Sequence, residues 1–265
     1  KKDGDGARQP FRLRRFSSIS ELAQDLEGMK DVWISQDDVY RNIDHAFFIT
    51  HDNNVSDLIN RSQQRVGDIA ACVTGIYSGN DTKYLRPISA NIKNSRKYQI
   101  VDPDLISTDY LNYPNLLSGI ESPKCFIPIM KGGGVKYFKP TVWYIDWSQK
   151  AVSTYHSDKR ARFQNANYYF KQGVGVPMVS SSQVTAALIE QTVFDQSIVG
   201  IFPCDPKLTN YLLAFFNSPT CNTLIQTINP SANNSSNYIK KIPFIPPGDE
   251  VLAEVDDLVN QILNA

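Results

Sequence analysis

The chain has 265 residues, of which 42% are hydrophobic and 20% are charged, as in an ordinary globular protein with one large domain or two small ones. No stretch approaches the roughly 18 consecutive apolar residues of a membrane-spanning helix. The four cysteines form no CxxC pair, which argues against a zinc site or a disulfide framework. We therefore expect a cytoplasmic protein with reduced cysteines, no metal site and no membrane partner.

The net charge of zero hides a strong segregation along the chain. Residues 1–60 hold 8 basic and 11 acidic residues, and residues 172–265 hold 3 and 8. Residues 83–171 hold 14 basic and 6 acidic residues, a net charge of +8. This middle third is basic enough to attract a polyanion, although a solvated basic face would give the same count.

The sequence of residues 1–64 indicates a segment that precedes the main domain. Residues 11–16 alternate apolar and basic side chains, which favours an edge strand. Residues 18–29 have the cap and the apolar spacing of a short helix, and residues 47–65 indicate a loop that passes into another helix. We expect residues 1–64 to be a connector from, or the end of, an upstream domain.

From residue 65 onward, short apolar runs alternate with turns rich in glycine, asparagine and proline. These runs predict strands over residues 66–73, 126–130, 142–147, 167–170 and 193–194. Helical spacing predicts helices over residues 208–217 and 251–263. We expect a mixed α/β (α+β) fold with a curved, mixed or antiparallel sheet, long loops, and helices toward the C-terminal side. Residues 65–248 would form one domain and residues 249–265 a C-terminal amphipathic helix.

No catalytic motif is complete. Asn229-Pro230-Ser231-Ala232 lacks the aromatic residue that an amino methyltransferase stacks on a flipped base. Lys131-Gly132-Gly133-Gly134 lacks the Gly-Lys-Ser/Thr end of a phosphate-binding loop, and the Glu-x-Lys of common restriction nucleases does not occur. We expect no catalytic residue and no bound cofactor within this chain.

Three blocks, residues 67–86, 128–148 and 159–174, combine small-residue turns with basic, amide and aromatic side chains. Such turns let backbone amides approach a phosphate, while arginine and asparagine can read base edges. The candidate DNA-contacting residues are Asn80, Lys83, Tyr84, Arg86, Lys131, Lys136, Arg160, Arg162, Asn165, Asn167 and Lys171. For each of them, a surface or core position without a DNA contact remains open.

In this order, the blocks resemble the C-terminal target-recognition domain of TaqI- and Eco57I-type adenine-specific DNA methyltransferases of type II restriction-modification systems. The resemblance rests on Gly67-Asp68-Ile69, Gly75-Ile76-Tyr77-Ser78-Gly79-Asn80, Lys131-Gly132-Gly133, Trp147-Ser148 and Asn167-Tyr168-Tyr169-Phe170. It implies sequence-specific binding of double-stranded DNA. It also implies an upstream domain in cis that binds S-adenosylmethionine and methylates adenine, with or without a fused endonuclease.

An alternative hypothesis is a protein–protein interaction module of a phage-defence complex. Residues 238–243 also resemble the strand-then-helix ending of specificity subunits in type I systems. On this hypothesis the amphipathic helix over residues 249–264 is the docking surface. Packing of that helix on its own domain would give the same sequence pattern.

Overall fold

A computed structural model of the chain describes residues 10–13, 20, 32–41, 53–180, 183–229 and 231–265. At the N-terminal end, β1 (Phe11–Leu13) pairs antiparallel with β2 (Val32–Ile34), and α2 (Gln36–Arg41) follows. The strand expected over residues 11–16 is therefore confirmed for its first half. Its second half, and nearly all of the helix expected over residues 18–29, lie outside the described residues.

The central sheet is antiparallel and has the strand order β4-β11-β8-β9. These strands are β4 (Ala70–Thr74), β11 (Ile198–Pro203), β8 (Gly173–Pro177) and β9 (Ala187–Ile189). Because side chains alternate along a strand, each face of this sheet carries its own apolar set. Val174 and Val199 lie on the face that packs against helices, whereas Ile198 and Phe202 lie on the other.

Helices from both ends of the described chain cover the first face. They are α3 (Asn53–Arg61), α7 (Leu208–Phe216), α8 (Pro219–Ile228) and α9 (Ser236–Ile239). Ile59 of α3 and Leu212 of α7 are fully buried in this core. The helix expected within residues 47–65 is confirmed as α3, although residues 47–52 lie outside the described residues. The helix expected over residues 208–217 is confirmed as α7, and α8 begins at Pro219, which cannot continue the preceding helix.

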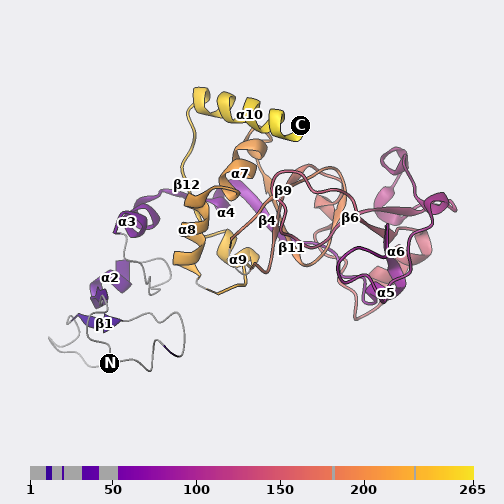
Figure 1. The fold of residues 1–265 in the computed structure, drawn as a ribbon, viewed down its shortest axis with the longest axis horizontal. Coiled ribbons are helices and arrows are strands. Elements are labelled where there is room, and N and C mark those ends of the chain that lie inside the picture. Colours follow the sequence, from indigo (N-terminus) through magenta and orange to yellow (C-terminus); the bar gives the residue numbers. More distant parts are fainter. Residues whose placement is uncertain (1–9, 14–19, 21–31, 42–52, 181–182, 230) are drawn as a thin grey trace.

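A second sheet, which we call the distal sheet, packs on the opposite face of the central sheet. Its order is β10-β6-β7-β5, from β10 (Val193–Phe194), β6 (Phe126–Met130), β7 (Trp143–Asp146) and β5 (Leu85–Pro87). β10 pairs parallel with β6 and the other pairs are antiparallel. Helix α6 (Gln149–Ser157) buries Val152 and Tyr155 in the same core. Figure 1 shows α7–α9 on one side of β4 and β11, and β6 and α6 on the other.

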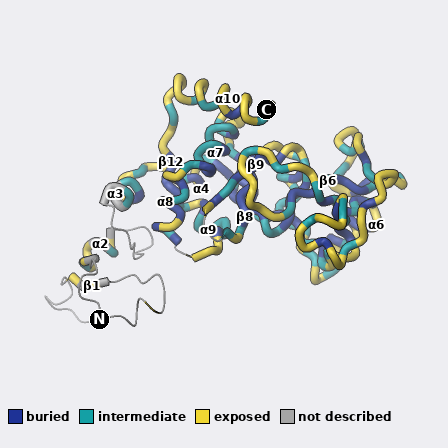
Figure 2. The backbone as a smooth tube through the Cα atoms, viewed as in Figure 1, coloured by how far each residue is buried: buried dark blue, intermediate teal, exposed yellow. Residues whose placement is uncertain are grey.

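The C-terminal helix α10 (Asp249–Leu263) lies along α7, after β12 (Pro243–Phe244) has paired with β3 (Gln64–Arg65). Val259 is buried against the helical core, but Val251, Leu258 and Ile262 are 46–50% exposed. Figure 2 shows that much of the outer surface of α10 is exposed. In the part of the chain that is described, no helix is both long and apolar enough to cross a membrane.

The expected α+β fold is confirmed, with mixed and antiparallel sheets and helices toward the C-terminal side. Long irregular connections also occur, as expected. They contain the 3-10 turns η3 (Pro103–Leu105), η4 (Tyr110–Asn112) and η5 (Leu116–Ser118). The four cysteines are free, and Cys72 and Cys221 are buried.

The prediction of a strand over residues 66–73 is wrong for its first four residues, and the prediction of a strand over residues 167–170 is wrong throughout. Val66–Ile69 forms the short helix α4, because the Asp68 carboxylate accepts a hydrogen bond from the Arg65 backbone amide at 2.7 Å and fixes a helical turn. The strand predicted over residues 167–170 is absent. Ala166–Tyr168 forms the 3-10 turn η6, and Phe170 has a φ of 62°, which a strand does not allow.

Candidate nucleic-acid interface

Two loops from distant parts of the sequence lie side by side at one edge of the distal sheet. The first is the turn over residues 74–83 after β4, and the second is the loop over residues 158–165 after α6. The Arg162 backbone amide donates to the Tyr77 carbonyl at 2.8 Å, and the Tyr77 amide donates back at 3.2 Å. Gly79, at φ 78°, allows this approach, since an added Cβ would lie 3.0 Å from the other loop's backbone. We call residues 77–83 and 158–162 together the two-loop surface.

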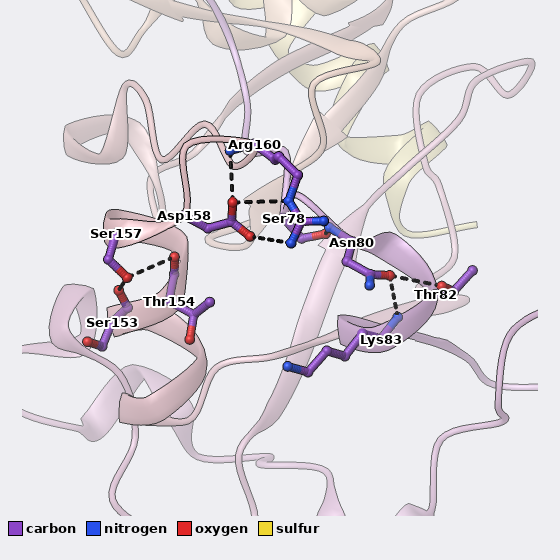
Figure 3. Close-up of polar contacts among 9 residues, drawn as sticks. All are labelled: Ser78, Asn80, Thr82, Lys83, Ser153, Thr154, Ser157, Asp158 and Arg160. Carbon is purple, nitrogen blue, oxygen red and sulfur yellow. Dashed lines mark hydrogen bonds and ion pairs between the residues drawn. The ribbon is translucent and has the colours of Figure 1, made fainter.

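The first loop is fixed by its own hydrogen bonds. Asn80 caps α5 (Asp81–Tyr84): its Oδ1 accepts from the Lys83 amide at 3.2 Å and from the Thr82 hydroxyl at 2.9 Å. These bonds use the oxygen of Asn80, while its Nδ2 has no partner among the residues described. The Lys83 side chain is exposed, with its ammonium 4.7 Å from the Tyr84 ring centroid. Figure 3 shows this turn facing the second loop.

The second loop presents two arginines. Arg160, with a side chain that is 73% exposed, pairs with Asp158 through two hydrogen bonds of 3.2 and 2.9 Å (Figure 3). Hydrogen bonds from the Arg160 side chain and backbone lower the pKa of Asp158, and the charge of Lys83 adds to this effect. The charges of Lys83 and Arg160 therefore both act on the Asp158 carboxylate. Arg162 is also exposed, and its guanidinium has no partner within the described ranges.

A partly buried ion-pair cluster lies beneath the first loop. The Lys131 Nζ is 3.0 Å from Asp81 Oδ2 and 2.9 Å from Asp195 Oδ2, and the Asp195 side chain is only 3% exposed. Burial acts to lower the pKa of Lys131, but the two carboxylates outweigh burial, and the pKa is raised. Asp81 also accepts a hydrogen bond from the Ser78 hydroxyl at 2.8 Å. Lys131 thus ties the two-loop surface to the ends of β6 and β10.

Three further candidates hold the loops in place. Tyr84 is buried, with its ring edge-on to Tyr155 at a centroid distance of 5.0 Å. The Asn165 Nδ2 donates to the Thr74 carbonyl at 2.9 Å. Arg86 donates to two backbone carbonyls and lies over the Phe126 ring. Their polar groups or rings are engaged within the protein, whereas the guanidinium of Arg162 has no partner among the residues described.

The remaining candidates lie at other parts of the fold. The Lys136 Nζ donates to the Asn217 carbonyl at the end of α7, at 3.2 Å. The Lys171 ammonium is 5.7 Å from the Tyr168 ring centroid, and Asn167 is exposed on η6. The structure therefore brings Asn80, Lys83, Arg160 and Arg162 together on one surface, and it leaves Lys136 and Lys171 outside that group.

A hollow of about 380 Å³ adjoins the two-loop surface. It is lined by Thr74, Gly132, Gly133, Arg162, Gln164, Pro177, Met178, Val179, Gln196 and Ser197. Sequence reasoning missed the two glutamines. Gln164 stands in the Arg-x-Arg-Phe-Gln-Asn run and could have been included for its amide, but nothing in the sequence relates Gln196 to that run. Among the residues described, no three His, Cys, Asp or Glu side chains come close enough together to hold a metal ion.

No protein-family model matches the chain. The chain is similar to the adenine-specific methyltransferase PglX of Lacticaseibacillus casei (strain Zhang), with 22% identity over 196 residues. The match covers 71% of this chain, and it spans only 15% of the length of that relative. The similarity supports a methyltransferase-related protein, and it does not single out the TaqI-type recognition domain.

Proposed function

We propose that this chain recognises the sequence of double-stranded DNA as the specificity domain of an adenine-specific DNA methyltransferase. Residues 65–248 are the recognition domain, residues 1–64 connect it to an upstream catalytic domain, and residues 249–265 form a terminal helix. S-adenosylmethionine binds in that catalytic domain, outside this chain. The similarity to part of a much longer adenine-specific methyltransferase supports this division.

The observation that carries the proposal is the gathering of exposed cations on the two-loop surface. Lys83, Arg160 and Arg162 come from loops that are distant in sequence and adjacent in space. Cations that neutralise phosphates release condensed counterions, which is the main source of affinity for DNA of any sequence. Because the Arg160 side chain is 73% exposed, the net stabilisation from its pair with Asp158 is small, and Arg160 can exchange the carboxylate for a phosphate at little cost.

Binding to a fluorescent duplex of random sequence tests this proposal. We expect the logarithm of the association constant to fall linearly with the logarithm of salt concentration, with a slope of about −0.9 for each phosphate contact. Combining Arg160→Ala with Arg162→Ala should weaken binding and flatten that slope by about 0.9 to 1.8. The matched control is Lys207→Ala with Lys240→Ala, two exposed lysines on the helical side of the molecule.

Three outcomes would overturn the proposal. They are binding that does not depend on salt, an arginine double variant that binds like the unmodified chain, and a lysine double variant that is equally impaired. Calorimetry with S-adenosylmethionine tests separately whether the methyl donor binds outside this chain. We expect no heat of binding to this chain, and saturable binding would assign the methyl donor here.

A second candidate function is a protein contact made by α10. The exposed Val251, Leu258 and Ile262 are spaced by seven and four residues, so they form one apolar stripe on the helix. The five acidic residues of α10 all lie within residues 249–257, which lets two copies pair antiparallel with each acidic half beside an uncharged half. Sedimentation velocity over a range of concentrations tests for such a dimer. A dimer that Leu258→Glu abolishes would support this function, and a monomer at all concentrations would rule out such a dimer.

A further inference from the structure

We propose that the hollow beside Arg162 is a base-reading pocket, in which Arg162 and Gln164 recognise the major-groove edge of a G·C base pair. This inference rests on the proposed DNA-binding function and names residues that determine its specificity. The pocket is the 380 Å³ hollow that lies between the second loop, the Gly132–Gly133 turn and the start of the chain after β8.

The two side chains share a face because of the residue between them. Phe163 turns inward and stacks on the buried Trp147, with ring centroids 5.8 Å apart and an interplanar angle of 30°. Arg162 and Gln164 flank Phe163 in the chain and do not join its ring in that aromatic cluster. Both line the hollow.

The orientation of the Gln164 amide is fixed by its partners. Its Nε2 donates to the Thr74 hydroxyl oxygen at 2.9 Å and to the Gly75 carbonyl at 3.2 Å. A carbonyl only accepts hydrogen bonds, so the nitrogen must face Gly75, and both of its hydrogens are in use. The Oε1 has no partner in the part of the chain that the structure describes, and it is not among the buried polar atoms that lack one there, so it is open to solvent. Gln164 therefore enters the pocket as a hydrogen-bond acceptor.

Arg162 supplies the complementary donors. Its backbone is fixed to Tyr77 by two hydrogen bonds, and its exposed guanidinium has no partner in the described part of the chain. A G·C pair displays the O6 and N7 acceptors of guanine next to the N4 amine of cytosine in the major groove. The fork of Arg162 matches the two guanine acceptors, and the Gln164 oxygen matches the amine.

The opposite wall leaves room for a base edge. Gly132 has a φ of 72°, and an added Cβ there would meet nothing within 4 Å. Gly133 lies so close to Pro177 that a Cβ would fall 2.0 Å from the proline ring. Backbone without side chains thus forms this wall. The Gln196 amide also lines the hollow, where its side chain is half-buried and has no hydrogen-bond partner in the described structure.

Selection of bound duplexes from a random-sequence library, followed by sequencing, tests the pocket with the full chain. Arg162→Lys keeps the charge and removes the fork, and Gln164→Met keeps the size and removes the acceptor. We expect each to reduce the preference for G·C at the same single position by about ten-fold or more. Lys83→Ala is the matched control and should weaken binding to all sequences without changing the selected motif. Thermal unfolding of each variant verifies that it remains folded.

The outcomes separate this inference from the proposed function. If the unmodified chain binds no duplex, both fail. If it binds, but Arg162→Lys and Gln164→Met select the unmodified motif, the pocket is wrong while DNA binding stands. Relaxation at an A·T position would overturn the G·C assignment, because the arginine fork would then be reading a different edge. Relaxation at two separate positions would show that the two side chains do not act on one base pair.

Discussion

Replacing Lys131 with methionine should lower the free energy of unfolding by about 2–4 kcal/mol, somewhat less than the roughly 3–5 kcal/mol that removing one partner from a fully buried ion pair costs, because Lys131 and Asp81 are partly exposed. The Asp195 side chain is 3% exposed, and Asp81 binds the same ammonium. Without Lys131, two carboxylates would face each other with little solvent to screen them. The Ser197 amide hydrogen bond to Asp195, at 2.8 Å, would remain and offset only a small part of the loss.

Urea denaturation followed by tryptophan fluorescence measures this effect. Lys83→Met, which removes an exposed lysine from the same surface, should change stability by less than about 0.5 kcal/mol. Adding Asp81→Asn and Asp195→Asn to Lys131→Met should recover much of the loss, because no unpaired charge then remains. A Lys131→Met variant as stable as the Lys83→Met control would show that the cluster carries little stability.

The raised pKa of Lys131 also sets the pH range over which the cluster stabilises the fold. A lysine whose pKa is higher in the folded state contributes stability at all pH values below its unfolded pKa. That contribution is lost as the pH rises through the folded value, which lies above 10.5. Denaturation midpoints of the unmodified chain should therefore show no loss from Lys131 between pH 6 and 9, and a loss above pH 10.5 that Lys131→Met lacks.

Some elements of the fold can be predicted from the sequence because one local signal decides them. The helix over residues 251–263 follows from the spacing of its apolar residues, and β6 and β7 follow from short runs of β-forming residues. The aromatic run over residues 167–170 has the same composition and yet forms no strand. There, Asn165 and Phe170 both adopt positive φ, and Tyr169 packs edge-on against the buried Trp147. Tertiary packing determines the conformation of that segment, and no local sequence pattern predicts it.

The candidate site also has features that the local sequence predicts and features that depend on tertiary contacts. The sequence indicates which loops carry basic and amide side chains, but it does not reveal that Tyr77 and Arg162 join them. Lys131 begins a glycine turn within a block that also carries basic and aromatic side chains, and the sequence therefore made it a candidate DNA contact. Its partners Asp81 and Asp195 lie 50 and 64 positions away in the chain. A lysine that binds phosphate and a lysine that neutralises distant carboxylates have the same local sequence signal.

Substituting Gly75 with alanine should destabilise the chain by about 3 kcal/mol or more, because the added carbon has no space. A Cβ there would lie 1.7 Å from the Phe194 carbonyl oxygen and 2.4 Å from its carbonyl carbon. Both are backbone atoms, and the same oxygen accepts a hydrogen bond from the Ile76 amide at 2.9 Å. Relief of the clash must therefore separate the end of β4 from β10, at the junction of the two sheets.

The matched control is Gly248→Ala, since a Cβ at Gly248 meets nothing within 4 Å and the backbone φ is −70°. Its cost should stay below about 1 kcal/mol, the usual range for exchanging glycine and alanine at a helix N-cap. The Gly75 carbonyl also accepts a hydrogen bond from Gln164, so any folded Gly75→Ala protein should select DNA less stringently at the position that we propose Gln164 reads. Equal stability of the two alanine variants would mean that β4 and β10 tolerate separation, and the proposed base-reading pocket would then lack the rigid base that its geometry requires.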